Sequence, residues 1–300
     1  DAIDFTNQLV CPPGKKTRTL FWSGMCNPSE EALMYTDGMG VSNLNGGDPV
    51  YDSLHPFLVG VSPLYTQVGG RYQFHTCAAG DFYYTGAWTK DYDGMKRLVE
   101  YFNYTEEPRR LRAMNLYYHF YLAERELGIA GLKIAIDWVV SHKPAYRFAS
   151  NDVDIVKDMI VTRLGRDAQG NLVVSNAGAM RTIRFDGVTQ RPDLAKSSGV
   201  LGYNTAGNRL YVHLDDAGVH RIALADNPSN NRVYLERASH YINGWKATPG
   251  ALAFSFKGTG PASFALLGMD KNASYKVSLA GQPDKTLRSD GSGRLTWEGT

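Results

Sequence analysis

Several features that define large protein classes are missing from this 300-residue chain. It has only three cysteines, Cys11, Cys26 and Cys77, and none of the Cys/His spacings that bind zinc. No apolar run approaches the 18 or so residues of a membrane-spanning helix. The net charge of +2 is too small to predict attraction to nucleic acid or to anionic lipid. We therefore expect a globular protein with no membrane span and no nucleic-acid partner.

Common catalytic motifs are absent as well. Neither HxxxH nor HExxH occurs, which excludes a metal site carried by one helix. The GxSxG turn of serine hydrolases is missing, and so are the P-loop and the GxGxxG turn of nucleotide-binding proteins. Any active site must therefore be assembled from residues that are distant in sequence.

Aromatic residues are abundant, with 18 tyrosines and 5 tryptophans. This composition is typical both of sugar-binding proteins and of aromatic core strands, and composition alone does not separate the two. The densest aromatic segment, 113–121, reads as a buried strand that ends in tyrosines and contains His119. A buried strand that carries a titratable residue at its carboxyl end is how α/β proteins build active sites. His119 is thus a candidate for a sugar-binding cleft, although an ordinary core histidine is the alternative.

The order of elements predicts two domains. Residues 1–165 alternate strand-like and helix-like segments, which favours a parallel sheet or a β/α barrel with too few strands to be complete. Predicted strands cover 17–23, 41–45, 57–61, 71–75 and 113–121, and predicted helices cover 27–38, 93–102, about 123–142 and 153–164. Residues 166–300 contain short strands and turns, including a predicted hairpin of 209–214 with 219–224, and favour a β-sandwich.

Further candidate residues lie at predicted strand ends and in one loop. Asp48 follows the strand 41–45 in a Gly-Gly-Asp turn, and in a parallel sheet it would share an edge with His119 and orient it. Such a turn is also common without any function. We expect sugar-binding side chains at strand ends and in the aromatic loop 82–88. The alternative is that these aromatic side chains only fill the end of the barrel. These candidates are Trp22, Asn45, Tyr84, Trp88 and Tyr118.

Five motifs in order resemble a known family. They are Pro12-Pro-Gly-Lys-Lys16, Leu20-Phe-Trp-Ser-Gly24 with Cys26-Asn-Pro-Ser29, Asn43-Leu-Asn-Gly-Gly-Asp48, Pro108-Arg-Arg-Leu111 and Tyr117-Tyr-His-Phe-Tyr121. Together they resemble the C-terminal part of the bacterial periplasmic proteins that deacetylate, and separately hydrolyse, the Pel exopolysaccharide of biofilms. These proteins are polysaccharide deacetylases related to the family-four carbohydrate esterases. The resemblance covers about residues 1–160 and is weaker beyond.

The resemblance implies a distorted β/α barrel followed by a β-sandwich, in a periplasmic or secreted protein. It implies a divalent metal, usually zinc, held by one Asp and two His, and a histidine that protonates the leaving amine. His119 stands where that general acid belongs, and Asp48 stands where the family places an orienting carboxylate. The metal ligands and the catalytic base belong to an earlier part of the family's chain. We therefore expect the preceding part of the same protein, or a companion chain, to supply them, and the isolated chain to be inactive.

Two other functions are compatible with the sequence. The first is a non-catalytic carbohydrate-binding or scaffold module in exopolysaccharide export. The second is a glycoside hydrolase, which needs two carboxylates facing each other across a cleft. Asp48 has no evident partner for that role, although Asp37, Asp52 and Asp81 are candidates.

Overall fold

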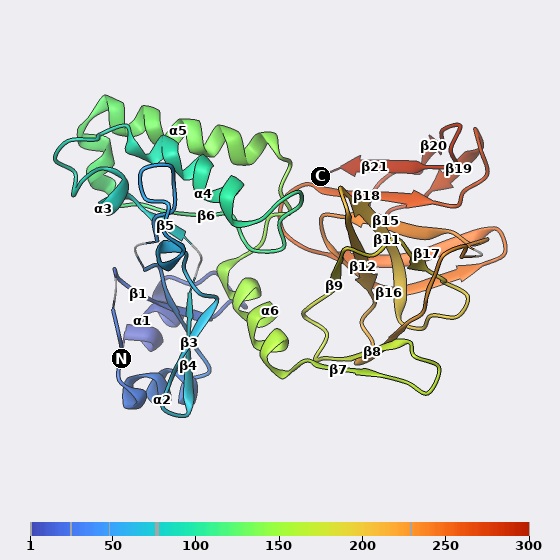
Figure 1. Cartoon of the computed structure of the whole chain (residues 1–300), viewed down its shortest axis with the longest axis horizontal. Coiled ribbons are helices and arrows are strands. Elements are labelled where there is room, and N and C mark those ends of the chain that lie inside the picture. Colours follow the sequence, from blue (N-terminus) through green and yellow to red (C-terminus); the bar gives the residue numbers. More distant parts are fainter. Residues whose placement is uncertain (1, 25, 48, 76–77, 229, 300) are drawn as a thin grey trace. The chain divides into compact units, whose positions relative to one another are not determined.

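The computed structural model describes residues 2–24, 26–47, 49–75, 78–228 and 230–299 (Figure 1). The chain divides into two compact units. The first consists of residues 1–144 and 149–156, and the second of residues 145–148 and 157–300. The chain passes from the first unit to the second within the helix α6 (Ala149–Val161).

The first unit is a mixed α/β structure with two small open sheets. One sheet has the order β1-β2-β4-β3, in which β1, β2 and β4 are parallel and β3 is antiparallel to β4. The other sheet pairs β5 with β6 in parallel. The bounds are β1 (Thr19–Trp22), β2 (Ser42–Asn45), β3 (Tyr65–Val68), β4 (Arg71–His75), β5 (Ala78–Gly80) and β6 (Asn115–Tyr117). The parallel pairing of neighbouring strands agrees with the βα alternation of the sequence.

Helices connect these strands. They are α1 (Ala2–Leu9), α2 (Glu30–Gly38), α3 (Asp81–Tyr84), α4 (Leu98–Thr105) and α5 (Glu126–Ser141), with the 3₁₀ turns η1 (Leu58–Gly60), η2 (Gly94–Arg97) and η3 (Phe120–Glu124). The core of the unit forms where α5 packs on η2 and α4. It is built on Tyr84, Met95, Leu98, Tyr101 and Phe102, all buried, against Ala135 and Val139 of α5.

Three local predictions for the first unit need correction. The predicted strand 57–61 is the turn η1, and the long strand predicted over 113–121 is only the three residues of β6, followed by η3. The helix predicted from residue 27 is α2, which begins at Glu30 and is capped by Ser29, whose Oγ accepts a hydrogen bond from the amide of Ala32. Strand β6 is short because it pairs only with the three residues of β5, so that the ladder spans Asn115–Tyr117 alone.

The second unit consists almost entirely of antiparallel strands in several small sheets. Their orders are β11-β12-β9, β13-β8-β7 and β15-β18-β21, with the pairs β10-β14, β16-β17 and β19-β20. The bounds are β7 (Arg163–Arg166), β8 (Leu172–Ser175), β9 (Thr182–Asp186), β10 (Arg191–Pro192), β11 (Val200–Ala206), β12 (Arg209–Leu214), β13 (Val219–Ile222), β14 (Leu224–Ala225), β15 (Tyr234–Ala238), β16 (Tyr241–Thr248), β17 (Ala251–Lys257), β18 (Ala262–Leu267), β19 (Ser274–Val277), β20 (Lys285–Arg288) and β21 (Leu295–Gly299).

The predicted hairpin of 209–214 with 219–224 is wrong. Strand β12 pairs with β11 and β9, whereas β13 pairs with β8. The turn between β12 and β13 therefore joins two different sheets. Two apolar clusters fill this unit, one around Val174, Leu210 and Val212, and the other around Leu266, Phe264 and Trp297.

Candidate functional site

The parallel strands β5 and β6 each end just before a polar residue of the candidate site. Asp81 follows Gly80 as the first residue of α3, and His119 lies two residues after Tyr117. Because Gly80 and Tyr117 are paired in register, the two strand ends bring Asp81 and His119 to the same edge of the sheet. The carboxylate Oδ1 of Asp81 lies 2.9 Å from Nδ1 of His119.

The Asp81 carboxylate is completely buried and accepts hydrogen bonds at both oxygens. Its Oδ2 accepts from the backbone amide of His119 and from the indole Nε1 of Trp88, each at 2.9 Å. These two fixed donors orient the carboxylate, so that Oδ1 faces the imidazole. The arrangement favours the tautomer with the proton on Nδ1 and leaves Nε2 of His119 for chemistry.

The other ring nitrogen of His119, Nε2, belongs to a side chain that is only partly buried. The side chain is 31% exposed, and Nε2 is 3.3 Å from the hydroxyl of Tyr117. A buried carboxylate on one ring nitrogen and an accessible second nitrogen is the arrangement of a general acid or base. The pair can therefore donate or accept a proton at Nε2, while Asp81 stabilises the imidazolium form.

Aromatic rings surround His119. Tyr121 lies parallel to the imidazole, with 5.7 Å between ring centroids and an interplanar angle of 9°. Trp88 meets the imidazole edge-on at 5.3 Å, and Tyr117 does so at 5.2 Å. Such rings fix the orientation of the imidazole and offer faces on which a sugar ring can stack.

A left-handed backbone turn places Trp88 in this site. Gly86, Ala87 and Trp88 have φ angles of 58°, 57° and 58°, a conformation that costs about 1–2 kcal/mol for each residue with a Cβ. The Thr85 hydroxyl accepts a hydrogen bond from the amide of Trp88 at 3.0 Å and donates one to the carbonyl of Asp81 at 2.7 Å. Backbone strain of this kind concentrates at functional sites, and here it brings an indole N–H onto Asp81.

The structure brings only some of the predicted site residues together. Trp88 contacts His119, and Tyr118 is exposed beside it. Tyr84 is fully buried in the core, where burial raises the pKa of its hydroxyl far above the ordinary range. Asp48 and Cys77 lie outside the described residues, so nothing follows for the predicted role of Asp48 or for a disulfide.

Trp22 and Asn45 lie on neighbouring strands, in register with each other. The amide of Asn45 is buried, donating to the carbonyl of Cys26 and accepting from the amide of Gly47 at 2.6 Å. Both ends of that side chain are therefore engaged with backbone. The indole Nε1 of Trp22 is buried without a hydrogen-bond partner among the described residues.

The sequence interpretation missed the pairing of Asp81 with His119. Asp81 had been considered only as one of three carboxylates for a glycoside hydrolase. Both of its oxygens are occupied by donors, which makes it a poor nucleophile and a good orienting group. The other two have structural partners, since Asp37 pairs with Arg71 and the buried Asp52 binds Arg97 and His55.

A metal site does not emerge from the described parts of the chain. Within them, no group of three or more His, Cys, Asp or Glu side chains is placed to hold a cation. His75 ends β4, where burial lowers the pKa of its imidazole, and its Nε2 lies 3.2 Å from the hydroxyl of Thr66. The residues present therefore do not fit the zinc site that the family resemblance implies.

Comparison with models of protein families, with curated proteins and with solved structures found no match for this chain. Among the helices that the structure describes, none has the length and apolar character needed to cross a membrane. The interpretation of the site consequently rests on the geometry of Asp81, His119 and the aromatic rings around them.

Proposed function

We propose that this chain is part of a metal-dependent polysaccharide N-deacetylase and supplies its general acid. The substrate would be an exopolysaccharide of the biofilm matrix that contains N-acetylhexosamine, and the protein would act in the periplasm or outside the cell. The observation that carries the proposal is the Asp81–His119 hydrogen bond of 2.9 Å at the carboxyl ends of two parallel strands. A distorted β/α barrel and a β-sandwich accessory domain belong to the same proposal.

In this proposal His119 holds the proton that the leaving group needs. Its protonated Nε2 donates that proton to the amine nitrogen as the C–N bond of the acetamide breaks, and acetate leaves on the other side. The Asp81 carboxylate stabilises the imidazolium before the transfer and keeps the ring in position during it. The Tyr117 hydroxyl, 3.3 Å from Nε2, would have to yield this contact to the amine nitrogen.

The divalent metal of such enzymes, usually zinc, polarises the carbonyl and activates the attacking water. Since the described residues offer no ligand set, the proposal assigns the ligands to the preceding part of the same protein or to a companion chain. In this proposal the partner would cover apolar side chains that are exposed on the first unit. They include Phe5 and Leu9 of α1 and Ile134, Ile136 and Val140 of α5.

Acetate release tests the proposal. We expect the isolated chain, supplied with Zn²⁺, to release no acetate from an N-acetylated polysaccharide. In the full-length gene product, His119→Ala should lower the rate by about 10²–10⁴-fold, the usual effect of removing a general acid. Robust acetate release by the isolated chain would contradict the division of the active site between two segments.

A non-catalytic carbohydrate-binding module is the second candidate. Exposed aromatic side chains near His119 favour it: Phe82, Tyr83, Tyr118, Phe120 and Tyr121. The two candidates differ in what they require of Nε2. Under the binding hypothesis, His119→Gln would change only the affinity for the sugar, through lost contacts. In addition, no segment encoded upstream would carry an Asp pair with an HxxxH motif.

A further inference from the structure

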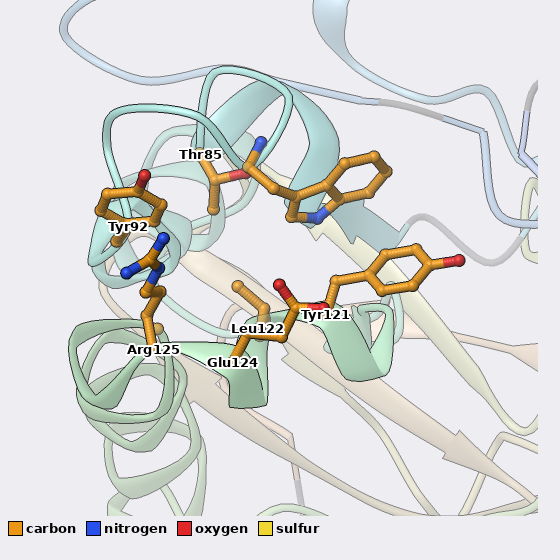
Figure 2. A pocket seen from close by; sticks show the side chains of 8 residues that line it. Thr85, Tyr92, Tyr121, Leu122, Glu124 and Arg125 are labelled. Atoms are coloured by element: carbon orange, nitrogen blue, oxygen red, sulfur yellow. The ribbon is translucent and has the colours of Figure 1, made fainter.

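A cavity of about 50 Å³ lies in the first unit, next to two of the aromatic rings that surround His119. It extends from the loop after α3 to the start of α5, and the two rings that contact His119, those of Trp88 and Tyr121, form part of its wall. Figure 2 shows Tyr92 and Arg125 on one side of the cavity and Tyr121 on the other. A group bound in this cavity would therefore contact the rings that flank the imidazole of His119.

The size of the cavity limits what it can bind. At roughly 10–15 Å³ for each water molecule, its volume corresponds to about three to five waters. This space is too small for a whole sugar ring, but it accommodates one exocyclic group of two or three heavy atoms. A sugar ring could remain outside, against the exposed face of Tyr121.

The charges in the wall limit the chemistry of the ligand. Glu124 and Arg125 are adjacent in the chain and both line the cavity, so the site has an acceptor and a donor of opposite charge. The guanidinium of Arg125 lies 5.2 Å from the ring centroid of Tyr92. The carboxylate of Glu124 makes no hydrogen bond or ion pair with any residue that the structure describes. Because these two opposite charges balance, the wall gives no net preference for a ligand charge of either sign.

A neutral hydroxyl group satisfies both side chains. It can donate its proton to the Glu124 carboxylate and accept a hydrogen bond from the Arg125 guanidinium. We propose that this cavity is a subsite for the exocyclic hydroxymethyl group of a neutral hexosamine unit, behind the rings that flank His119. The naming of the sugar rests on the function proposed above, whereas the binding of a neutral hydroxyl-bearing group rests on the cavity itself.

Binding to the 300-residue chain tests the subsite without catalysis. The two probes are tri-N-acetylchitotriose and the corresponding trimer of N-acetylxylosamine, which lacks the hydroxymethyl group. Titrations followed by NMR should show that the wild-type chain binds the first trimer about tenfold more tightly, the size expected for one hydrogen bond to a charged group. Glu124→Gln should remove most of this preference and leave the affinity for the xylosamine trimer unchanged.

Glu126→Gln is the matched control, because Glu126 is an exposed carboxylate two residues away that does not line the cavity. This variant should keep the preference of the wild type. Equal affinity for the two trimers, an unchanged preference in Glu124→Gln, or no binding of either trimer would each overturn the subsite. Acetate release tests the proposed function separately. If the binding experiment fails but His119→Ala still greatly lowers the rate of acetate release, the subsite is refuted and the proposed function stands.

Discussion

The imidazole of His119 has its two nitrogens in opposite environments. Nδ1 faces a buried carboxylate, whereas Nε2 lies near a tyrosine hydroxyl on a side chain that is partly exposed. Asp81 itself does not reach the place where a substrate would lie, so it acts through His119 as a positioning residue. Its effect on chemistry should therefore come through the tautomer and the charge of the imidazole.

Replacing Asp81 by asparagine tests this role. The amide oxygen of the new side chain must still accept from the amide of His119 and the indole of Trp88, which turns its NH₂ group toward Nδ1. Nδ1 then has to accept, and the proton moves to Nε2. We expect ¹⁵N NMR of the Asp81→Asn chain to show the Nε2–H tautomer, and the full-length gene product to lose at least about 10²-fold in deacetylation rate.

Asp91→Asn provides the control, since Asp91 is an exposed residue in the loop that follows Trp88. In the Asp91→Asn chain, the ¹⁵N NMR signals of the His119 imidazole should match those of the wild type. An Asp81→Asn chain that retained the Nδ1–H form of His119 would show that the carboxylate does not set the tautomer.

The sequence indicates His119 as a candidate site residue but does not indicate Asp81 as its partner, and the reason is physical. The strand before His119 carries a long aromatic run, whereas β5 is only Ala78–Gly80 and leaves no readable pattern. The positive φ angles of Ala87 and Trp88, which bring the indole onto Asp81, also have no sequence signature because neither residue is glycine. Tyr84 was expected to contact sugar, but its ring completes the core.

Among the elements of the first unit, α5 packs unusually close to its neighbours. A Cβ added at Gly131 would overlap the backbone carbonyl of Asp93, and one added at Gly128 would overlap that of Leu122. These glycines let the helix lie directly on η2 and η3, which fixes the segment that follows His119.

Gly131→Ala should therefore destabilise the first unit even though alanine favours helices. The gain in helix propensity is about 1 kcal/mol, whereas forcing a methyl group against fixed backbone costs about 1–3 kcal/mol or more. We expect a net loss of about 1–2 kcal/mol in the free energy of unfolding measured with urea. Gly38→Ala is the control, because nothing lies within 4 Å of an added Cβ there, and it should not lower stability.

In the second unit, Asp158 of α6 joins the helix to the loop between β8 and β9. The buried carboxylate accepts hydrogen bonds from the backbone amides of Ala177, Ala179 and Met180 at 2.5, 2.7 and 2.8 Å. Because three backbone amides would lose a charged acceptor that is itself buried, Asp158→Ala should lower the free energy of unfolding by about 3 kcal/mol or more.

Asp154 lies one turn earlier on α6 and serves as the comparison. It forms an exposed ion pair with Arg18 at 2.7 Å, an interaction worth less than about 1 kcal/mol. Thermal unfolding should therefore separate the two variants clearly. Similar effects of Asp154→Ala and Asp158→Ala would refute the structural role assigned to Asp158.

On the scale of the whole molecule, stability should depend on pH through His75. Burial lowers the pKa of this imidazole in the folded chain, whereas in the unfolded chain it stays near 6.5. The unfolded state thus binds a proton first as the pH falls, so the contribution to stability is present above about pH 6.5 and is lost below it. Urea titrations at pH 7.5 and 5.5 should show this decline, and His75→Gln should reduce it.

The broad order of the chain, mixed α/β followed by β, was readable from the sequence because periodicity and turn residues are local. Sheet closure and strand pairing could not be read from the sequence, because they depend on partners that are distant in sequence. The wrong pairing of β12 with β13 shows this limit: the turn Asp215–Gly218 looks like a hairpin, yet each strand finds a better partner elsewhere. A closed barrel and a sandwich therefore remain proposals.

The account as a whole depends on His119 as the proton donor of a deacetylase. The most direct measurement is the rate of acetate release from an N-acetylated polysaccharide by the full-length gene product, comparing the wild type with His119→Gln and measuring polymer binding in parallel. We predict a rate lower by about 10²–10⁴-fold with binding near that of the wild type. Wild-type turnover by His119→Gln would contradict the account.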